Sequence, residues 1–140
     1  MRLHPMLGTL LLVGACSGHG SLPVSLTASP STSPPDAITC SKAKLTQLGY
    51  QQTSLDQTDN RLTARKIDNT INRPDPQFRR NVNRIEVEAA AGADGKTALT
   101  VIGHTFAEYS TQRGPTEVEE KASADVSQAA QAVVSSCAQS

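Results

Sequence analysis

The alternation of apolar and polar residues is clearest in the middle of the chain. Residues 82–91 alternate, with Ile85, Val87 and Ala89 on one face and Arg84, Glu86 and Glu88 on the other. A period of two is typical of a half-buried strand. Asp94-Gly95 is a hairpin turn signal, and residues 97–109 are predicted as the returning strand. This strand has apolar residues on both faces, so a central position or a bulge at Gly103 is expected.

Two weaker strand patterns precede this hairpin. Residues 50–58 alternate weakly, and residues 61–69 place two apolar side chains on one face. An Asp-Asn pair between them predicts a turn. Ile67 is out of phase, which indicates a bulge or an early strand end. Residues 72–81 contain two prolines and are predicted as a loop.

Helical spacing appears on both sides of the strands. The first predicted helix covers residues 36–50, with Asp36 as its N-cap and Gly49 at its C-terminus. A second helix follows a turn, and two starts compete for it. A capping box from Thr116 is one, and Ser123 before an acidic first turn is the other. The apolar stripe of this helix comprises Ala122, Val126, Ala129, Val133 and Cys137.

These elements predict an α+β domain with the order α-β-β-β-β-α. A four-stranded, mainly antiparallel sheet with both helices packed on one face would bury the apolar stripes. Residues 37–140 are assigned to this domain. Residues 16–36 are rich in Ser, Pro and Thr and are predicted to form a disordered tether.

Composition changes the picture mainly at the N-terminus. Residues 1–15 carry one positive charge at Arg2, then a short apolar run, then the small residues Gly14 and Ala15. This order is typical of a secretory signal peptide. The apolar run is far shorter than the ~20 residues that span a bilayer.

The sequence Val-Gly-Ala-Cys at positions 13–16 resembles the lipobox of bacterial lipoproteins. The resemblance implies that Cys16 becomes the first mature residue and carries acyl chains, palmitate among them, that hold the protein on a membrane. It further implies a cell-envelope location, with Ser17 typical of transfer to the periplasmic side of the outer membrane. The alternative is ordinary secretion after Ala15, which would leave Cys16 as a plain thiol.

The cysteine count agrees with lipidation. The chain has three cysteines, and an odd number in an exported protein needs an explanation. If Cys16 carries lipid, Cys40 and Cys137 form an even pair in an oxidising compartment. They lie near the start of the first helix and the end of the last, so antiparallel helices would bring them together. Free structural thiols are the alternative.

Charge is balanced overall but uneven along the chain. The formal net charge is zero, and we expect no nucleic-acid partner. The stretch 61–84, however, holds seven basic residues and two acids. An envelope protein or anionic lipid is therefore a candidate partner, and a solvated sheet face is the simpler alternative. The candidate interaction residues are Arg61, Arg65, Arg79, Arg80 and Arg84.

Catalytic signals are missing from the sequence. It contains no Gly-x-Ser-x-Gly elbow, no spaced set of metal ligands and no phosphate loop. We expect no enzyme activity and no cofactor. The predicted function is a small binding module that uses the open sheet face, including Glu86 and Glu88, or a sheet edge. A tethered accessory enzyme or transport component using His104 is one alternative, and a purely structural envelope lipoprotein is another.

Overall fold

A computed structural model describes residues 22–139 of the chain. Within that range it contains two helices and six strands, which are β1 (Val24–Ala28), α1 (Pro34–Gln47), β2 (Gln51–Asp56), β3 (Arg61–Asp68), β4 (Phe78–Ala91), β5 (Thr97–Thr111), β6 (Gly114–Glu120) and α2 (Ala124–Cys137). The predicted α+β class with a mainly antiparallel sheet is confirmed. The predicted count of four strands is wrong, because one strand precedes α1 and another precedes α2.

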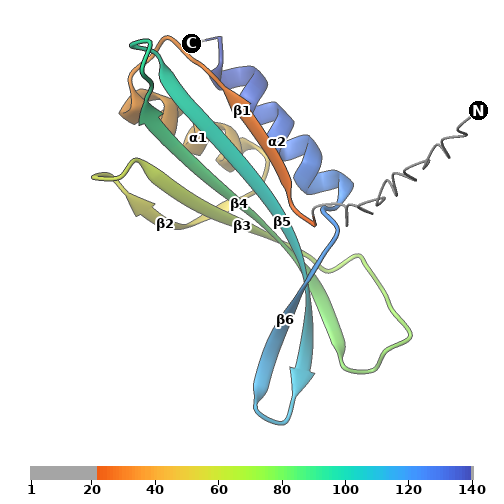
Figure 1. The fold of residues 1–140 in the computed structure, drawn as a ribbon. Coiled ribbons are helices and arrows are strands. Elements are labelled where there is room, and N and C mark those ends of the chain that lie inside the picture. The colour runs from red at the N-terminus through yellow and green to blue at the C-terminus, as the bar shows by residue number, and fades with distance from the viewer. Residues whose placement is uncertain (1–21, 140) are drawn as a thin grey trace, which may run out of the picture.

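All strands pair antiparallel in one sheet, in the order β1-β5-β4-β3-β2. The β4–β5 hairpin is its longest part (Figure 1). The other side of β5 is shared by two short strands. β1 pairs with Leu99–Gly103, and β6 pairs with Thr105–Thr111. The β5–β6 hairpin and the start of β4 beside it therefore extend past β1 and β2 (Figure 1).

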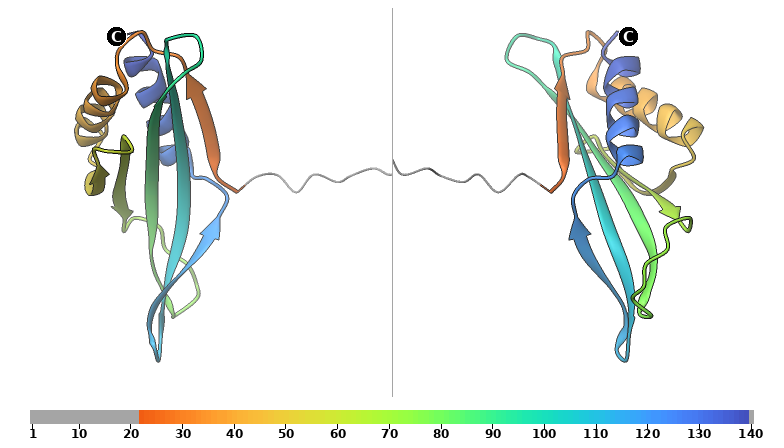
Figure 2. Two further views of the ribbon diagram at one scale, coloured as in Figure 1. Left: turned by 60° about the vertical axis from the view of Figure 1, so that its left-hand side comes forward. Right: turned by 90° about the vertical axis from the view of Figure 1, so that its right-hand side faces the viewer.

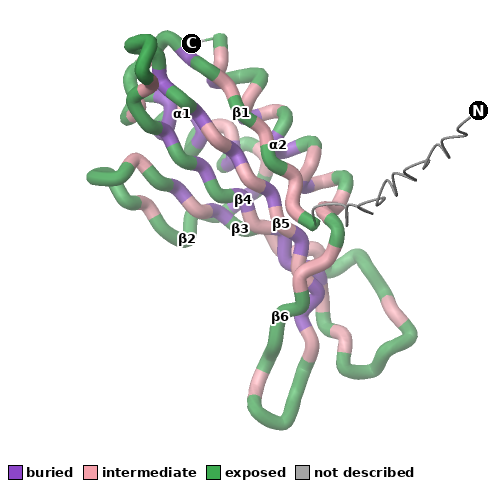
Figure 3. Tube along the Cα trace, in the orientation of Figure 1, coloured by how far each residue is buried: buried purple, intermediate pink, exposed green. Residues whose placement is uncertain are grey.

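Both helices cover the same face of the sheet (Figure 2). The strands present alternate apolar residues to them, as the period of two requires, and buried positions alternate with exposed ones along β4 (Figure 3). Ile85, Leu99 and Val133 are fully buried in this core. Gly103 lies where β1 and α2 approach β5 most closely. A Cβ at this position would be 2.9 Å from a methyl carbon of Val24, so only glycine fits without a shift.

The predicted disulfide is present. Cys40 in α1 and Cys137 at the end of α2 are bonded, with their Cα atoms 5.8 Å apart. The bond joins the middle of α1, and not its start as predicted, to the last residue of α2. It connects positions separated by 97 residues and closes almost the whole described chain into one loop.

The largest correction concerns the tether. Residues 16–36 were predicted to be disordered, but Val24–Ala28 form strand β1. Its alternation is short: Val24, Leu26 and Ala28 pack against the core, and the two residues between them are exposed. A Ser/Thr-rich composition hid this pattern, because those residues occupy the solvent side. The predicted signal peptide and Cys16 lie outside the described residues.

The second correction concerns the segment before α2. Gly114–Glu120 form the edge strand β6, so the capping box at Thr116 is wrong. The competing start is confirmed, because the Ser123 hydroxyl accepts the Val126 amide hydrogen as N-cap. In a similar way α1 is capped by Ser33, not Asp36.

Smaller differences lie within the strands. β4 begins at Phe78, inside the segment predicted as a loop. The pairing of β3 with β4 is continuous through Ile67, so the expected bulge is not there, and a register shift occurs in β2 instead. No register shift occurs at Gly103.

The start of α2 is fixed by a network of partly buried polar groups around Asp125. One oxygen of its carboxylate accepts hydrogen bonds from the Tyr50 hydroxyl and the Asn83 amide, at 3.0 and 3.2 Å. The other accepts from Lys66 at 2.8 Å. Burial, together with the Asp125 charge, raises the pKa of the Tyr50 phenol. This network ties α2 to β3 and β4, and its role is structural.

Candidate functional site

The sheet surface opposite the helices is the largest surface that no other element covers, and we call it the open face (Figure 2). An antiparallel sheet commonly leaves one face in water. The open face is built from alternate residues of four strands, namely Arg61, Thr63, Arg65 and Ile67 of β3, Arg80, Val82, Arg84, Glu86 and Glu88 of β4, Thr100, Ile102, His104, Phe106 and Glu108 of β5, and Glu117 and Glu119 of β6.

Most arginines of the open face are held by glutamates on neighbouring strands. Arg61 Nε lies 3.3 Å from Glu88 Oε2, across the β3–β4 pair. Arg80 Nε lies 3.1 Å from Glu108 Oε1, and Arg79 Nε approaches the same oxygen at 3.7 Å. The Arg61–Glu88 pair is exposed, and such a pair contributes little to stability, whereas the Glu108 carboxylate is buried between its two arginines. The main effect of these pairs is to fix both signs of charge in a defined pattern.

Arg84 lies at the centre of the face. Its guanidinium stacks over the Phe106 ring, 4.5 Å from the ring centroid, and donates a 3.0 Å hydrogen bond to Glu117. His104 stacks on the same Phe106 ring, with ring centroids 5.8 Å apart. Its Nδ1 lies 2.6 Å from Glu119. These contacts hold two polar side chains rigidly around one aromatic ring.

A small apolar cluster lies beneath these charges. Val82 is 2 % exposed although it belongs to the open face. Its cross-strand partners are Ile67 on β3 and Phe106 on β5. Cross-strand neighbours on one face pack directly against each other. This half of the open face is therefore a well-packed surface and not a mobile set of charges.

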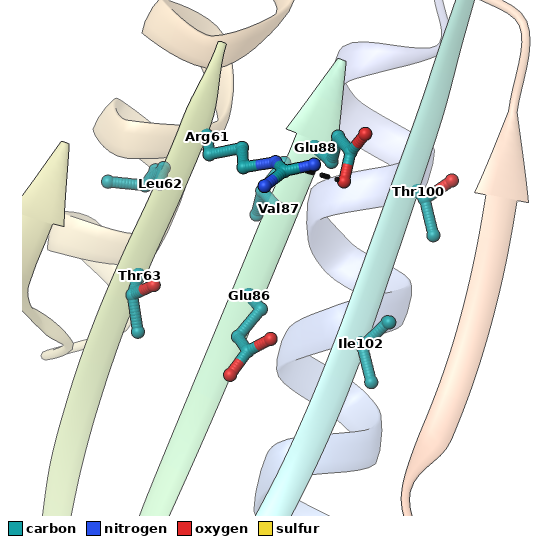
Figure 4. Close-up of a pocket in the computed structure, with 8 residues that line it drawn as sticks. All are labelled: Arg61, Leu62, Thr63, Glu86, Val87, Glu88, Thr100 and Ile102. Atoms are coloured by element: carbon teal, nitrogen blue, oxygen red, sulfur yellow. Dashed lines mark ion pairs between the residues drawn. The ribbon is translucent and has the colours of Figure 1, made fainter. Parts of the chain in front are cut away.

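The other half is hollowed into a shallow cavity of about 290 Å³ (Figure 4). Arg61 and Glu88 bridge one end of it, and Glu86, Thr63 and Ile102 point into the open space (Figure 4). The Glu86 side chain is exposed, and within residues 22–139 it has no hydrogen-bond or ion-pair partner. An unpaired carboxylate beside an apolar Ile102 side chain provides a cation-binding position with an adjacent hydrophobic contact.

The structure brings together most of the residues proposed from the sequence. Arg61, Arg65, Arg80 and Arg84 share the open face, while Arg79 lies at a register shift near its edge. The sequence interpretation included Glu88, the partner of Arg61, but missed Glu108, Glu117 and Glu119. Glu117 and Glu119 were assigned to a helix, and only recognition of the β6 edge strand could have placed them here.

The described residues give no support to metal chemistry or to a site built on His104. Among residues 22–139 no group of three or more His, Cys, Asp or Glu side chains is arranged to hold a metal ion. His104 lines neither the open-face cavity nor two further cavities, beside α1 and beside Gly49. In the same part of the chain, no helix is long and apolar enough to cross a membrane.

Comparison with known proteins adds no family. No family model matches the chain, and no curated protein is similar to it in sequence.

Proposed function

We propose that this chain is a cell-envelope lipoprotein, anchored through lipid on Cys16, that binds a partner protein through its open face. The observation that carries the proposal is the fixed pattern of charges on that face. Five glutamates lie among the four arginines of that face and Arg79 at its edge, and most of these charges are paired. Such a pattern favours a protein surface of matching charges, because complementary charges set orientation and exclude wrong partners.

The pattern argues against an anionic polymer or lipid on this face. A polyanion needs a surface of uniform positive potential. Here the paired glutamates neutralise the charge of the arginines locally. Among the arginines of the open face, only Arg65 has no carboxylate partner among the described residues. A basic patch read from residues 61–84 alone therefore overstates the positive charge of the folded surface.

The accessory-enzyme alternative has less support. An enzyme site built on His104 would need a deep pocket around that side chain. Instead, the His104 imidazole contacts the Glu119 carboxylate and stacks on the Phe106 ring. A purely structural lipoprotein would not need the unpaired Glu86 or the hollow beside it. The binding proposal uses both features.

A photo-crosslinking residue at Ile102, in the protein expressed in a bacterial envelope, tests the proposal. The matched control carries the same residue at Gln131, which is exposed on α2 in the other layer. We expect a discrete adduct from position 102 only, which is lost when Glu86 and Arg84 are changed together to Lys and Glu. Equal adducts from both positions, or an adduct that survives the charge exchange, would reject the open face as the binding surface.

A further inference from the structure

The three large hydrophobic side chains that the described residues expose all lie in the same part of the molecule. Leu22 is 45 % exposed, Ile71 38 % and Val118 51 %. Val118 belongs to β6, in the part of the sheet that extends past α2. Ile71 belongs to the segment 69–77 between β3 and β4. We call the β5–β6 hairpin beyond Thr105 and the segment 69–77 the distal end (Figure 1).

The two parts of the distal end are joined firmly. Arg73 reaches from the segment 69–77 to Glu120 of β6 with two hydrogen bonds of 2.5 and 2.6 Å. Its guanidinium also covers the Phe78 ring at 4.6 Å. This bidentate pair lowers the pKa of the Glu120 carboxyl. The distal end is therefore one connected surface, and it carries the exposed Arg113 at the turn between β5 and β6.

The chain joins the domain close to this end. The Leu22 carbonyl accepts a hydrogen bond from Ala122, one residue before the α2 cap, and β1 then runs away from the distal end. The register places Leu22 at the level of Thr105. From there to the end of β5 at Thr111 six residues span ~20 Å, whereas eight residues back to Thr97 span ~27 Å.

The lipid anchor limits how far the domain can move from a membrane. Six residue steps from Cys16 to Leu22 span at most ~22 Å. This maximum exceeds the ~20 Å between Leu22 and the tip of the distal end, so the distal end can touch the bilayer. It is shorter than the ~27 Å between Leu22 and the opposite end, so the opposite end cannot face the membrane with Leu22 above it. On the anchor of the proposed function, we therefore propose that the distal end is a second membrane contact. Ile71 and Val118 would touch the phospholipid surface, and Arg113 would meet its phosphate groups.

This contact has a consequence for the open face. β4 and β5 run from the distal end toward the turn at residues 92–96, so they would stand away from the bilayer. The open face would then be directed sideways, where a partner on the same membrane can reach it. The edge strand β6 would lie nearest the lipid, and β1 would lie farther from it.

The experiment uses the fact that the chain has no Trp. Ile71→Trp and Val118→Trp place a single fluorophore at exposed distal positions, and Ala93→Trp places it at the opposite turn as the matched control. Each acylated protein is reconstituted into phosphatidylethanolamine–phosphatidylglycerol vesicles whose acyl chains carry bromine as a quencher. Vesicle flotation of the same samples measures anchoring separately.

We expect quenching and a blue shift at positions 71 and 118, and neither change at position 93. Equal quenching at all three positions, or no quenching in protein that floats with the vesicles, overturns the distal contact and leaves the anchor intact. Acylated protein that fails to float overturns the anchor, and the contact falls with it.

Discussion

Breaking the Cys40–Cys137 bond should cost a large part of the stability of this domain. The bond connects residues separated by 97 positions, so opening it frees almost the whole described chain in the unfolded state. In the chain-entropy model, cross-linking a loop of about 100 residues contributes ~4.7 kcal/mol at 25 °C. Single domains are stable by only ~5–15 kcal/mol. We therefore expect the reduced protein to be close to marginal stability.

Urea unfolding of oxidised and reduced protein measures this effect without changing Cys40 or Cys137. A Cys16→Ala background removes the third thiol and the lipid. With a urea dependence of ~1–3 kcal/mol per molar, the loss of the bond should lower the midpoint by roughly 1.5–5 M. A double Cys40→Ala, Cys137→Ala variant is the second test, and it adds a small packing loss because Cys137 is fully buried.

A difference below ~1 kcal/mol between the oxidised and reduced proteins would contradict this reasoning. It would mean that the unfolded chain is already restrained without the bond, or that Cys40 and Cys137 do not lie close together in solution. A midpoint shift with an unchanged urea dependence would locate the effect in stability alone.

Three further changes test individual contacts. Gly103→Ala should destabilise the domain by ~1–3 kcal/mol in urea unfolding, since the added methyl meets β1 and α2; an unchanged midpoint would show that these elements can move apart. Tyr50 keeps its proton in the folded state beside Asp125, whereas the unfolded phenol ionises near pH ~10. Wild-type stability should therefore fall as pH rises above ~10, and Tyr50→Phe should remove this fall; an identical alkaline decline in both proteins would exclude Tyr50 as its cause. The pKa of Glu120 is lowered by Arg73, so their pair should stabilise the folded state above pH ~4.3 and be lost in more acid solution. The protection factors of amides in the segment that carries Arg73, which are corrected for the pH dependence of intrinsic exchange, should then fall at low pH in wild type, and in a Glu120→Gln variant they should be low at both acid and neutral pH.

Local patterns predicted the centre of this fold well. The β4–β5 hairpin was recognisable because its alternation is long and Asp94-Gly95 marks the turn. The disulfide was predictable from two observations: Cys40 and Cys137 lie on two predicted helices that pack side by side, and they form an even pair once Cys16 is set aside. In each case the sequence signal is local or nearly so, and several independent signals point to the same structure.

The edge strands were missed for a physical reason. β1 has a five-residue alternation in a Ser/Thr-rich segment, and β6 exposes most of its side chains. Neither strand can be stable alone, and each forms only because β5 offers it hydrogen bonds. Pairing with a distant strand leaves little trace in the sequence.

The candidate site was recognised only in part for the same reason. The arginines lie close together along β3 and β4, so their enrichment is visible in the sequence. Their partner Glu117 comes from a distant edge strand, and Glu108 lies 28 residues from Arg80. The sequence therefore indicated a basic surface, whereas the fold produces one of mixed charge.

The central claim is that this domain is held at a membrane by Cys16, and the mass of the mature chain tests it most directly. Intact mass and membrane fractionation should be compared for wild type and a Cys16→Ala variant, with and without reductant. We predict a chain that begins at Cys16, a mass gain of acyl size that is lost in the variant together with membrane attachment, and a deficit of about two hydrogen masses that reductant restores. A soluble wild-type protein without acyl chains would contradict the account.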